Sequence, residues 1–241
     1  MMKTIGLIGG MSWESTAVYY RRLNEQVRKA RGGLHSAEIL LRSVDFDTIV
    51  ALQTAGDWDG ATRVLQKIAR ELQAAGADCV LICTNTMHKL ADAVQSAIDI
   101  PLLNIIDICA QELKQAGARK PLLLATRYTM EHDFYRERMR RRHGIETLVP
   151  EADDRSAVHD VIFTELCCGI IRDASRQRYM EIIAKGRAAG ADSVILGCTE
   201  IGLLIQPENI DLPAYDSTLL HADAAVDFAL GSGPLGRADA A

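Results

Sequence analysis

The chain alternates short apolar runs with longer segments whose apolar positions recur at helical spacing. The short runs predict strands, at 4–8, 39–44, 79–82, 102–106, 122–125, 147–149, 193–196 and 214–215. The longer segments predict helices, at 15–30, 59–75, 87–98, 130–142, 156–171, 175–189 and 219–230, with one more ending at 116. Several of these helices stop at a glycine. Regular alternation of strands and helices predicts an α/β protein whose parallel sheets carry helices on both faces.

One segment of the first half is repeated in the second. Residues 74–85 (AAGADCVLICTN) align without a gap with residues 188–199 (AAGADSVILGCT). Each copy reads as a helix end, a glycine stop, a buried strand and a polar turn. We therefore expect two similar domains, residues 1–117 with 218–241 and residues 118–217.

Composition narrows the function classes. Of 241 residues, 48% are apolar and 24% charged, with a formal charge of -5, which disfavours nucleic-acid binding. No run approaches the ~20 apolar residues of a membrane span, and the start does not read as a signal peptide. We therefore expect a cytoplasmic protein with no membrane contact, six reduced cysteines and no metal site. The Gly/Ala-rich tail from Gly231 is predicted to be disordered.

The repeated turns are where chemistry is expected, because ligands bind at the carboxyl ends of parallel strands. The first turn reads Cys83-Thr84-Asn85-Thr86 and the second Gly197-Cys198-Thr199-Glu200. Two such turns facing one cleft between the domains suit proton removal and return on the two faces of one carbon. The field at a helix start is expected to lower the thiol pKa of Cys198. Residues 6–10 (GLIGG) do not match the dinucleotide-binding pattern, so no nucleotide cofactor is expected.

Three segments together, 9–15 (GGMSWES), 83–88 (CTNTMH) and 197–201 (GCTEI), resemble the aspartate/glutamate racemase family. The resemblance implies two pseudo-symmetric Rossmann-like domains with a cleft site, no pyridoxal phosphate, no metal and a homodimer. It implies racemisation of an amino acid, with aspartate, glutamate or both as the substrate. It implies a catalytic role for Cys198 and substrate contacts at Met11, Ser12, Gln53, Asn85, Thr86, Glu165 and Thr199. Glu200, like Thr199, stands beside Cys198, where its side chain can hydrogen-bond the substrate or orient the thiol.

The sequence departs from the family pattern at the first turn. Family members have cysteine immediately before Asn-Thr, where this chain has Thr84. Cys83 stands one residue earlier, but the repeat aligns Thr84 with Cys198 and Cys83 with Gly197. Because consecutive strand side chains point to opposite faces, we assign Thr84 to the second catalytic position and keep Cys83 as the lesser alternative. A hydroxyl is a poorer base than a thiol, which predicts two unequal half-sites. The resemblance implies that the second-turn cysteine takes the proton from the L-enantiomer, so we expect a preference for L-substrates, with Cys198 as base.

Several alternatives remain open on the sequence. Arg42 and Arg127 are each a potential partner for an acidic substrate side chain or an ordinary surface charge. His88 is either a residue that orients the first turn or a buried structural histidine. A broad-spectrum racemase, a one-cysteine decarboxylase of the same superfamily and a binding protein without turnover are the rival functions.

Overall fold

The computed structural model describes residues 2–232, so most of the tail predicted to be disordered lies outside the described residues. The chain divides into two compact units. Unit 1 comprises the chain up to Asn104 together with the chain from His221 onward, and unit 2 spans Ile105–Leu220. Among the described residues, none of the helices combines the length and apolar character needed to span a bilayer.

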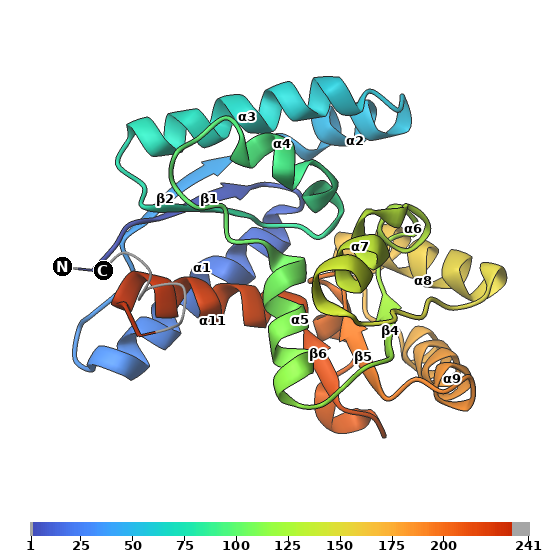
Figure 1. The fold of residues 1–241 in the computed structure, drawn as a ribbon. Coiled ribbons are helices and arrows are strands. Elements are labelled where there is room, and N and C mark those ends of the chain that lie inside the picture. Colours follow the sequence, from blue (N-terminus) through green and yellow to red (C-terminus); the bar gives the residue numbers. More distant parts are fainter. Residues whose placement is uncertain (1, 233–241) are drawn as a thin grey trace. The chain divides into compact units, whose positions relative to one another are not determined.

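Unit 1 is built on a parallel sheet with strand order β2-β1-β3. Its elements are β1 (Ile5–Gly9), α1 (Trp13–Arg31), β2 (Ile39–Ser43), α2 (Phe46–Thr54), α3 (Trp58–Ala74), β3 (Cys79–Ile82), the 3₁₀ helix η1 (Thr86–Leu90), α4 (Ala91–Gln95) and most of α11 (Ser217–Leu230). Figure 1 shows α3 on one side of β1 and β2, and α1 and α11 on the opposite side. Every residue of β1 and β3 is buried, as their continuous apolar runs predicted.

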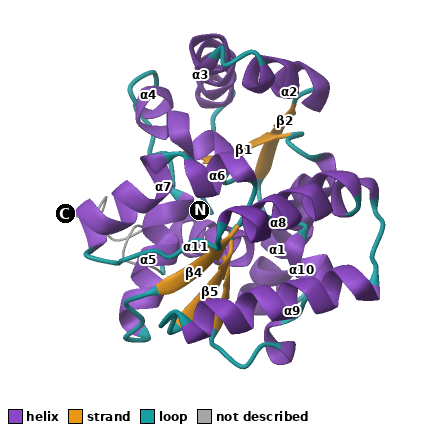
Figure 2. Ribbon diagram, turned by 90° about the vertical axis from the view of Figure 1, so that its right-hand side faces the viewer, coloured by secondary structure: helices purple, strands orange, loops and turns teal. Residues whose placement is uncertain are grey.

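Unit 2 is built on a second parallel sheet, with strand order β4-β5-β6. Its elements are α5 (Ile105–Gln115), β4 (Pro121–Leu124), α6 (Arg127–Glu131), α7 (Asp133–Arg138), the π-helix η2 (Met139–His143), α8 (Ala152–Thr164), the 3₁₀ helix η3 (Leu166–Cys168), α9 (Asp173–Ala188), β5 (Ser193–Leu196), α10 (Ile201–Leu204), η4 (Pro207–Asn209) and β6 (Ala214–Asp216). Figure 2 shows β4 and β5 between α5 and α9. The predicted fold class, parallel sheets flanked by helices, is confirmed in both units.

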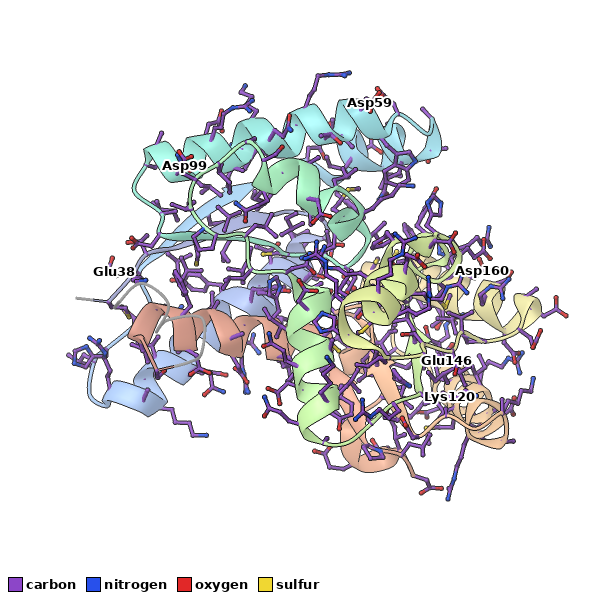
Figure 3. The ribbon with its side chains drawn as sticks, viewed as in Figure 1. Glu38, Asp59, Asp99, Lys120, Glu146 and Asp160 are labelled. Carbon is purple, nitrogen blue, oxygen red and sulfur yellow. The ribbon has the colours of Figure 1, made fainter. Side chains whose placement is uncertain are left out.

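The two sheets share one strand order once isolated bridges are included. Val80 of β3 bridges in parallel to Leu102, and Leu122 of β4 bridges in parallel to Leu148. With these bridges, the first sheet runs β2, β1, β3 and the Leu102 segment, and the second runs the Leu148 segment, β4, β5 and β6. In this order β1 corresponds to β4 and β3 to β5. The position beside β4 is reinforced by an ion pair between Lys120 Nζ and Glu146 Oε1 at 4.0 Å (Figure 3).

The repeated aspartate plays the same structural part in each unit. The carboxylate of Asp78 accepts a hydrogen bond from the backbone N–H of Thr4 at 2.6 Å, just before β1. The carboxylate of Asp192 accepts from the backbone N–H groups of Arg119 and Lys120 at 2.6 and 2.8 Å, just before β4. Each aspartate therefore ties the start of its own strand to the start of the neighbouring strand.

Some elements differ from the sequence prediction. The segments 102–106 and 147–149 contribute single bridges, and the helix predicted at 130–142 is divided into α6, α7 and η2. The helix α5, placed before the expected boundary at 117, packs with unit 2. The buried face of α5 belongs to the apolar core of unit 2. In addition, the carboxylate of Asp107 accepts hydrogen bonds from Arg138 Nε and His143 Nε2, both at 2.8 Å.

Candidate active site

The first segment of the candidate site is the turn between β1 and α1. Gly10 has a φ of 87°, and a Cβ there would lie 2.2 Å from the carbonyl oxygen of Val44, so only glycine fits. The Gly10 N–H donates to Thr16 Oγ1 at 2.8 Å, and Ser12 caps α1 by accepting from the Ser15 N–H. Met11 and Ser12, both predicted substrate contacts, are buried, and a cis peptide bond joins them.

The second segment follows β3. Thr84 is half-buried, whereas Asn85 and Thr86 are buried. His88 Nδ1 donates to the carbonyl oxygen of Thr84 at 2.8 Å, so this buried histidine holds the backbone of the turn from one helical turn further on. Met11 and Met87 belong to the same buried apolar cluster. The β1 turn and the β3 turn therefore rest on one core within unit 1.

The third segment, in unit 2, follows β5. The thiol of Cys198 donates a hydrogen bond to Glu200 Oε2 at 2.8 Å. The hydroxyl of Thr199 donates to the same oxygen at 2.9 Å. Cys198 is half-buried, and the Glu200 side chain is almost fully enclosed, with the residue 3% exposed. The three residues thus form a compact hydrogen-bonded group before α10.

The expected lowering of the Cys198 pKa is wrong. Burial raises the pKa of the Cys198 thiol well above its ordinary value, and the negative charge of Glu200 raises it further. The helix that follows, α10, has a single turn, so it supplies little of the dipole field on which the prediction relied. Cys198 is therefore held as a thiol in this structure.

The alternation assumed for the two turns is visible in the packing. Cys83 is fully enclosed, and burial raises the pKa of its thiol. At the equivalent position in unit 2, a Cβ on Gly197 would lie 2.7 Å from Leu123 Cδ1 and 3.1 Å from Ala125 Cβ. Both positions therefore face the apolar interior, while Thr84 and Cys198 are each half-buried at the following position.

The remaining predicted contacts lie on helices. Gln53 is buried on α2. Glu165, at the end of α8, accepts a hydrogen bond from Ser175 Oγ at 2.6 Å and lies 3.4 Å from Arg172 Nη1. The pKa of Tyr179 on α9 is raised well above its ordinary value, chiefly by burial, and Cys198 and Glu165 lie close enough to raise it further. Glu165 and Cys198 thus lie around the same tyrosine in unit 2.

Sequence reasoning missed Ser175 and Tyr179 as neighbours of these residues. Tyr179 donates through its hydroxyl to the carbonyl oxygen of Val158 at 3.0 Å, so its polar end is satisfied inside the unit. Both residues belong to an amphipathic helix whose sequence reads as ordinary core packing. No motif distinguishes them, because their proximity to Glu165 comes from the packing of α9 against α8.

The two arginines left open by the sequence have different surroundings. Arg42, at the end of β2, lies 3.6 Å from Glu71 Oε2 on α3 and borders a groove of about 250 Å³. Two residues separate the end of β4 from Arg127, which begins α6, and the Nη2 of Arg127 lies 4.0 Å from Oδ1 of Asp160, which is labelled in Figure 3. Within residues 2–232, no group of three or more His, Cys, Asp or Glu side chains is arranged to hold a metal ion.

Comparison with known proteins gives one consistent result. Residues 8–225 match the family model of the Asp/Glu/hydantoin racemases. A candidate Asp/Glu racemase from Yersinia pestis is 51% identical, with a TM-score of 0.90, over 95% of this chain and 100% of that one. An aspartate racemase homologue from Pyrococcus horikoshii is 32% identical, with a TM-score of 0.84, over the same shares of the two chains. The broad-specificity amino-acid racemase of Bacillus subtilis is 20% identical over 92% of this chain and 96% of its own length.

Proposed function

Since the chain belongs to the Asp/Glu/hydantoin racemase family and is an amino-acid racemase of that superfamily, we propose that its substrates are aspartate, glutamate or both. The reaction removes the Cα proton on one face and returns a proton on the other, without a cofactor. The observation that carries the proposal is the pair of equivalent turns, which presents a half-buried Cys198 in unit 2 and a half-buried Thr84 in unit 1.

The two catalytic positions are chemically unequal, and this inequality sets the preference for L-substrates. Cys198 takes the proton from the L-enantiomer, and Thr84 stands on the reprotonating side, directly or through water. A threonine hydroxyl is far less acidic than a thiol, so it is a poor base at neutral pH. Removal of the proton from the D-enantiomer is therefore the slower direction.

The substrate contacts follow from the polar groups near each turn. The Cα carbanion is stabilised by hydrogen-bond donors around the substrate carboxylate, for which Asn85, Thr86 and Thr199 supply side chains. The Met11–Ser12 segment contributes backbone groups, and Gln53 contributes an amide. Glu165 is an acceptor, which suits the substrate ammonium group rather than a carboxylate.

Proton NMR in heavy water tests this function. L-aspartate and L-glutamate are expected to lose their Cα–H signal in the presence of the wild-type protein, more quickly than the D-enantiomers. A Cys198→Ala variant should show no exchange, and a Cys168→Ala variant, which alters an exposed thiol, is the matched control. Equal exchange rates from L and D would contradict the proposed asymmetry. Absence of exchange for every amino acid would contradict the function itself.

A broad-spectrum racemase is the second candidate, favoured by the similarity to the Bacillus subtilis enzyme of broad specificity. The same NMR experiment on a panel of neutral and basic amino acids separates it from an acid-specific enzyme. Carbon dioxide release from substituted malonates would instead indicate the one-cysteine decarboxylase.

A homodimer is part of the proposal. Unit 1 exposes large apolar side chains on α1, where Trp13 is 68% and Tyr20 55% exposed. The neighbouring edge strand β2 exposes Leu41. Exposed apolar groups of this kind commonly mark an interface between subunits. Light scattering of the eluted protein would give twice the chain mass for a dimer, and a Trp13→Glu variant should shift it toward the monomer.

A further inference from the structure

Glu200 is a buried carboxylate whose Oε2 faces its own turn. Two side chains, the Cys198 thiol and the Thr199 hydroxyl, donate to this oxygen at 2.8 and 2.9 Å. A carboxylate that accepts from a thiol is placed to take the thiol proton, since the hydrogen bond already defines the path of transfer. The sequence left Glu200 either as a substrate contact or as a residue that orients the thiol, and these bonds direct its oxygen to Cys198.

We propose that Glu200 is the proton acceptor of Cys198, so that the two side chains share one proton and Glu200 acts through the thiol rather than on the substrate. At rest the proton is on sulfur and the carboxylate is charged. The arrangement differs from a free thiolate, because the negative charge of the pair is stored on Glu200 until the site is occupied.

Other titratable groups surround the pair. They are Cys167 on η3, Tyr179 on α9 and Glu165 at the end of α8. Burial has the largest effect on the pKa of Cys198, followed by Glu200, and the effect of Cys167 is smaller; all three raise it. The shift therefore agrees with the hydrogen-bond geometry, in which Glu200 is the direct partner of the sulfur.

The role in catalysis rests on the proposed function, and the protons balance as follows. The S–H bond of Cys198 breaks and an O–H bond forms on Glu200, which leaves a thiolate and a neutral acid. The thiolate then takes the Cα proton of the L-substrate, so that sulfur is protonated again and a carbanion remains. The Thr84 hydroxyl, or a water molecule that it holds, protonates the opposite face of the carbanion and completes the D-product. Water replaces that proton and takes the proton of the Glu200 acid, so the number of protons is unchanged and the starting state is restored.

A thiol titration tests the pair without requiring turnover. The rate of iodoacetamide alkylation at Cys198, followed by peptide mass spectrometry, is measured against pH for the wild type, Glu200→Asp and Glu200→Gln. We expect the pH midpoint of alkylation to be highest in the wild type, lower in Glu200→Asp and lowest in Glu200→Gln. The fall for Glu200→Gln should be about one pH unit or more, because neutralising the carboxylate removes a charge that opposes the thiolate. Glu181→Gln, which removes an exposed negative charge of unit 2, should leave the midpoint unchanged.

The outcomes separate the possibilities. A midpoint for either Glu200 variant that equals or exceeds the wild-type value overturns the proposal, and Glu200→Asp decides alone if Glu200→Gln fails to fold. In the exchange assay, Glu200→Gln should lower kcat for L-substrates by about tenfold or more while changing KM little. A raised KM with an unchanged alkylation profile would return Glu200 to substrate binding. If the wild type exchanges no amino acid, the proposed function fails, while the alkylation profiles still decide whether Glu200 and Cys198 share a proton.

Discussion

The hydroxyl of Tyr19 donates a hydrogen bond to Nδ1 of His221 at 2.8 Å, deep inside unit 1. The opposite nitrogen, Nε2, donates to the carbonyl oxygen of Leu103, also at 2.8 Å. The bond from Tyr19 requires the neutral ring, because a doubly protonated imidazole would leave Nδ1 with no capacity to accept it. Burial and the nearby His88 lower the pKa of His221 to about 3.

The neutral His221 predicts a loss of stability in acid. Its folded pKa of about 3 lies below the ordinary value of 6.5, so protons bind preferentially to the unfolded chain as the pH falls below 6.5. Between pH 7 and pH 4.5 this one group should remove about 2–3 kcal/mol from the free energy of unfolding. Urea unfolding at the two pH values measures the loss. A His221→Gln variant should be less stable at pH 7 but lose about 2 kcal/mol less on acidification, and an equal loss would show that His221 is not the group responsible.

A Thr84→Cys variant should make the two proposed catalytic positions, Thr84 and Cys198, more alike. A thiol at this position is a better base than the hydroxyl, so Cα exchange from D-aspartate and D-glutamate should rise by about tenfold or more, with a smaller change for the L-enantiomers. Proton NMR in heavy water measures both rates. Cys83→Ser is the matched control, because it alters the adjacent, fully enclosed thiol. It should lower stability by roughly 1–3 kcal/mol through a buried hydroxyl and leave exchange intact. If Cys83→Ser abolishes Cα exchange and Thr84→Cys brings no gain, then Cys83 occupies the second catalytic position and Thr84 does not.

Gly10→Ala should destabilise unit 1 far more than an ordinary change at a left-handed glycine. Its φ of 87° disfavours any Cβ, and the added atom would meet backbone oxygen and nitrogen of Val44 at 2.2 and 2.5 Å. Gly56→Ala is the control, because its φ is 69° with open space around the added atom. The control should cost about 1–2 kcal/mol for the backbone alone, and Gly10→Ala at least about 2 kcal/mol more. Urea unfolding of the two variants gives the comparison, and equal losses would show that the turn moves away from Val44 easily.

The buried strands and the two repeated turns were predictable because a few consecutive residues are enough to identify each of them. Continuous apolar runs predicted β1, β3, β4 and β5. The alignment of the two repeats showed that Thr84 and Cys198 occupy equivalent positions in the sequence. The helix α2 was not predicted, because its nine residues carry little apolar periodicity. The thiol pKa was predicted in the wrong direction because the sequence shows neither how deeply the Cys198 thiol is buried nor where the Glu200 side chain points. Only its rotamer brings the carboxylate to 2.8 Å from the sulfur.

The two arginines give a last prediction, about the side chain of the substrate. Arg127 lies just beyond the carboxyl end of β4, after Ala125 and Thr126, at the strand end where ligands of parallel sheets bind. Its ion pair with Asp160 is long, at 4.0 Å. Arg42 is engaged by Glu71 and by the carbonyl oxygen of Ser43, to which its Nη1 donates at 2.9 Å. We therefore expect Arg127→Met to raise KM for aspartate and glutamate by about tenfold, the usual effect of losing one charge-assisted contact, with little change for neutral amino acids. Arg42→Met should leave both classes unchanged. Exchange rates across substrate concentrations measure these effects. If Arg42→Met, rather than Arg127→Met, raised KM for aspartate and glutamate alone, the side-chain carboxylate of the substrate would be bound by unit 1.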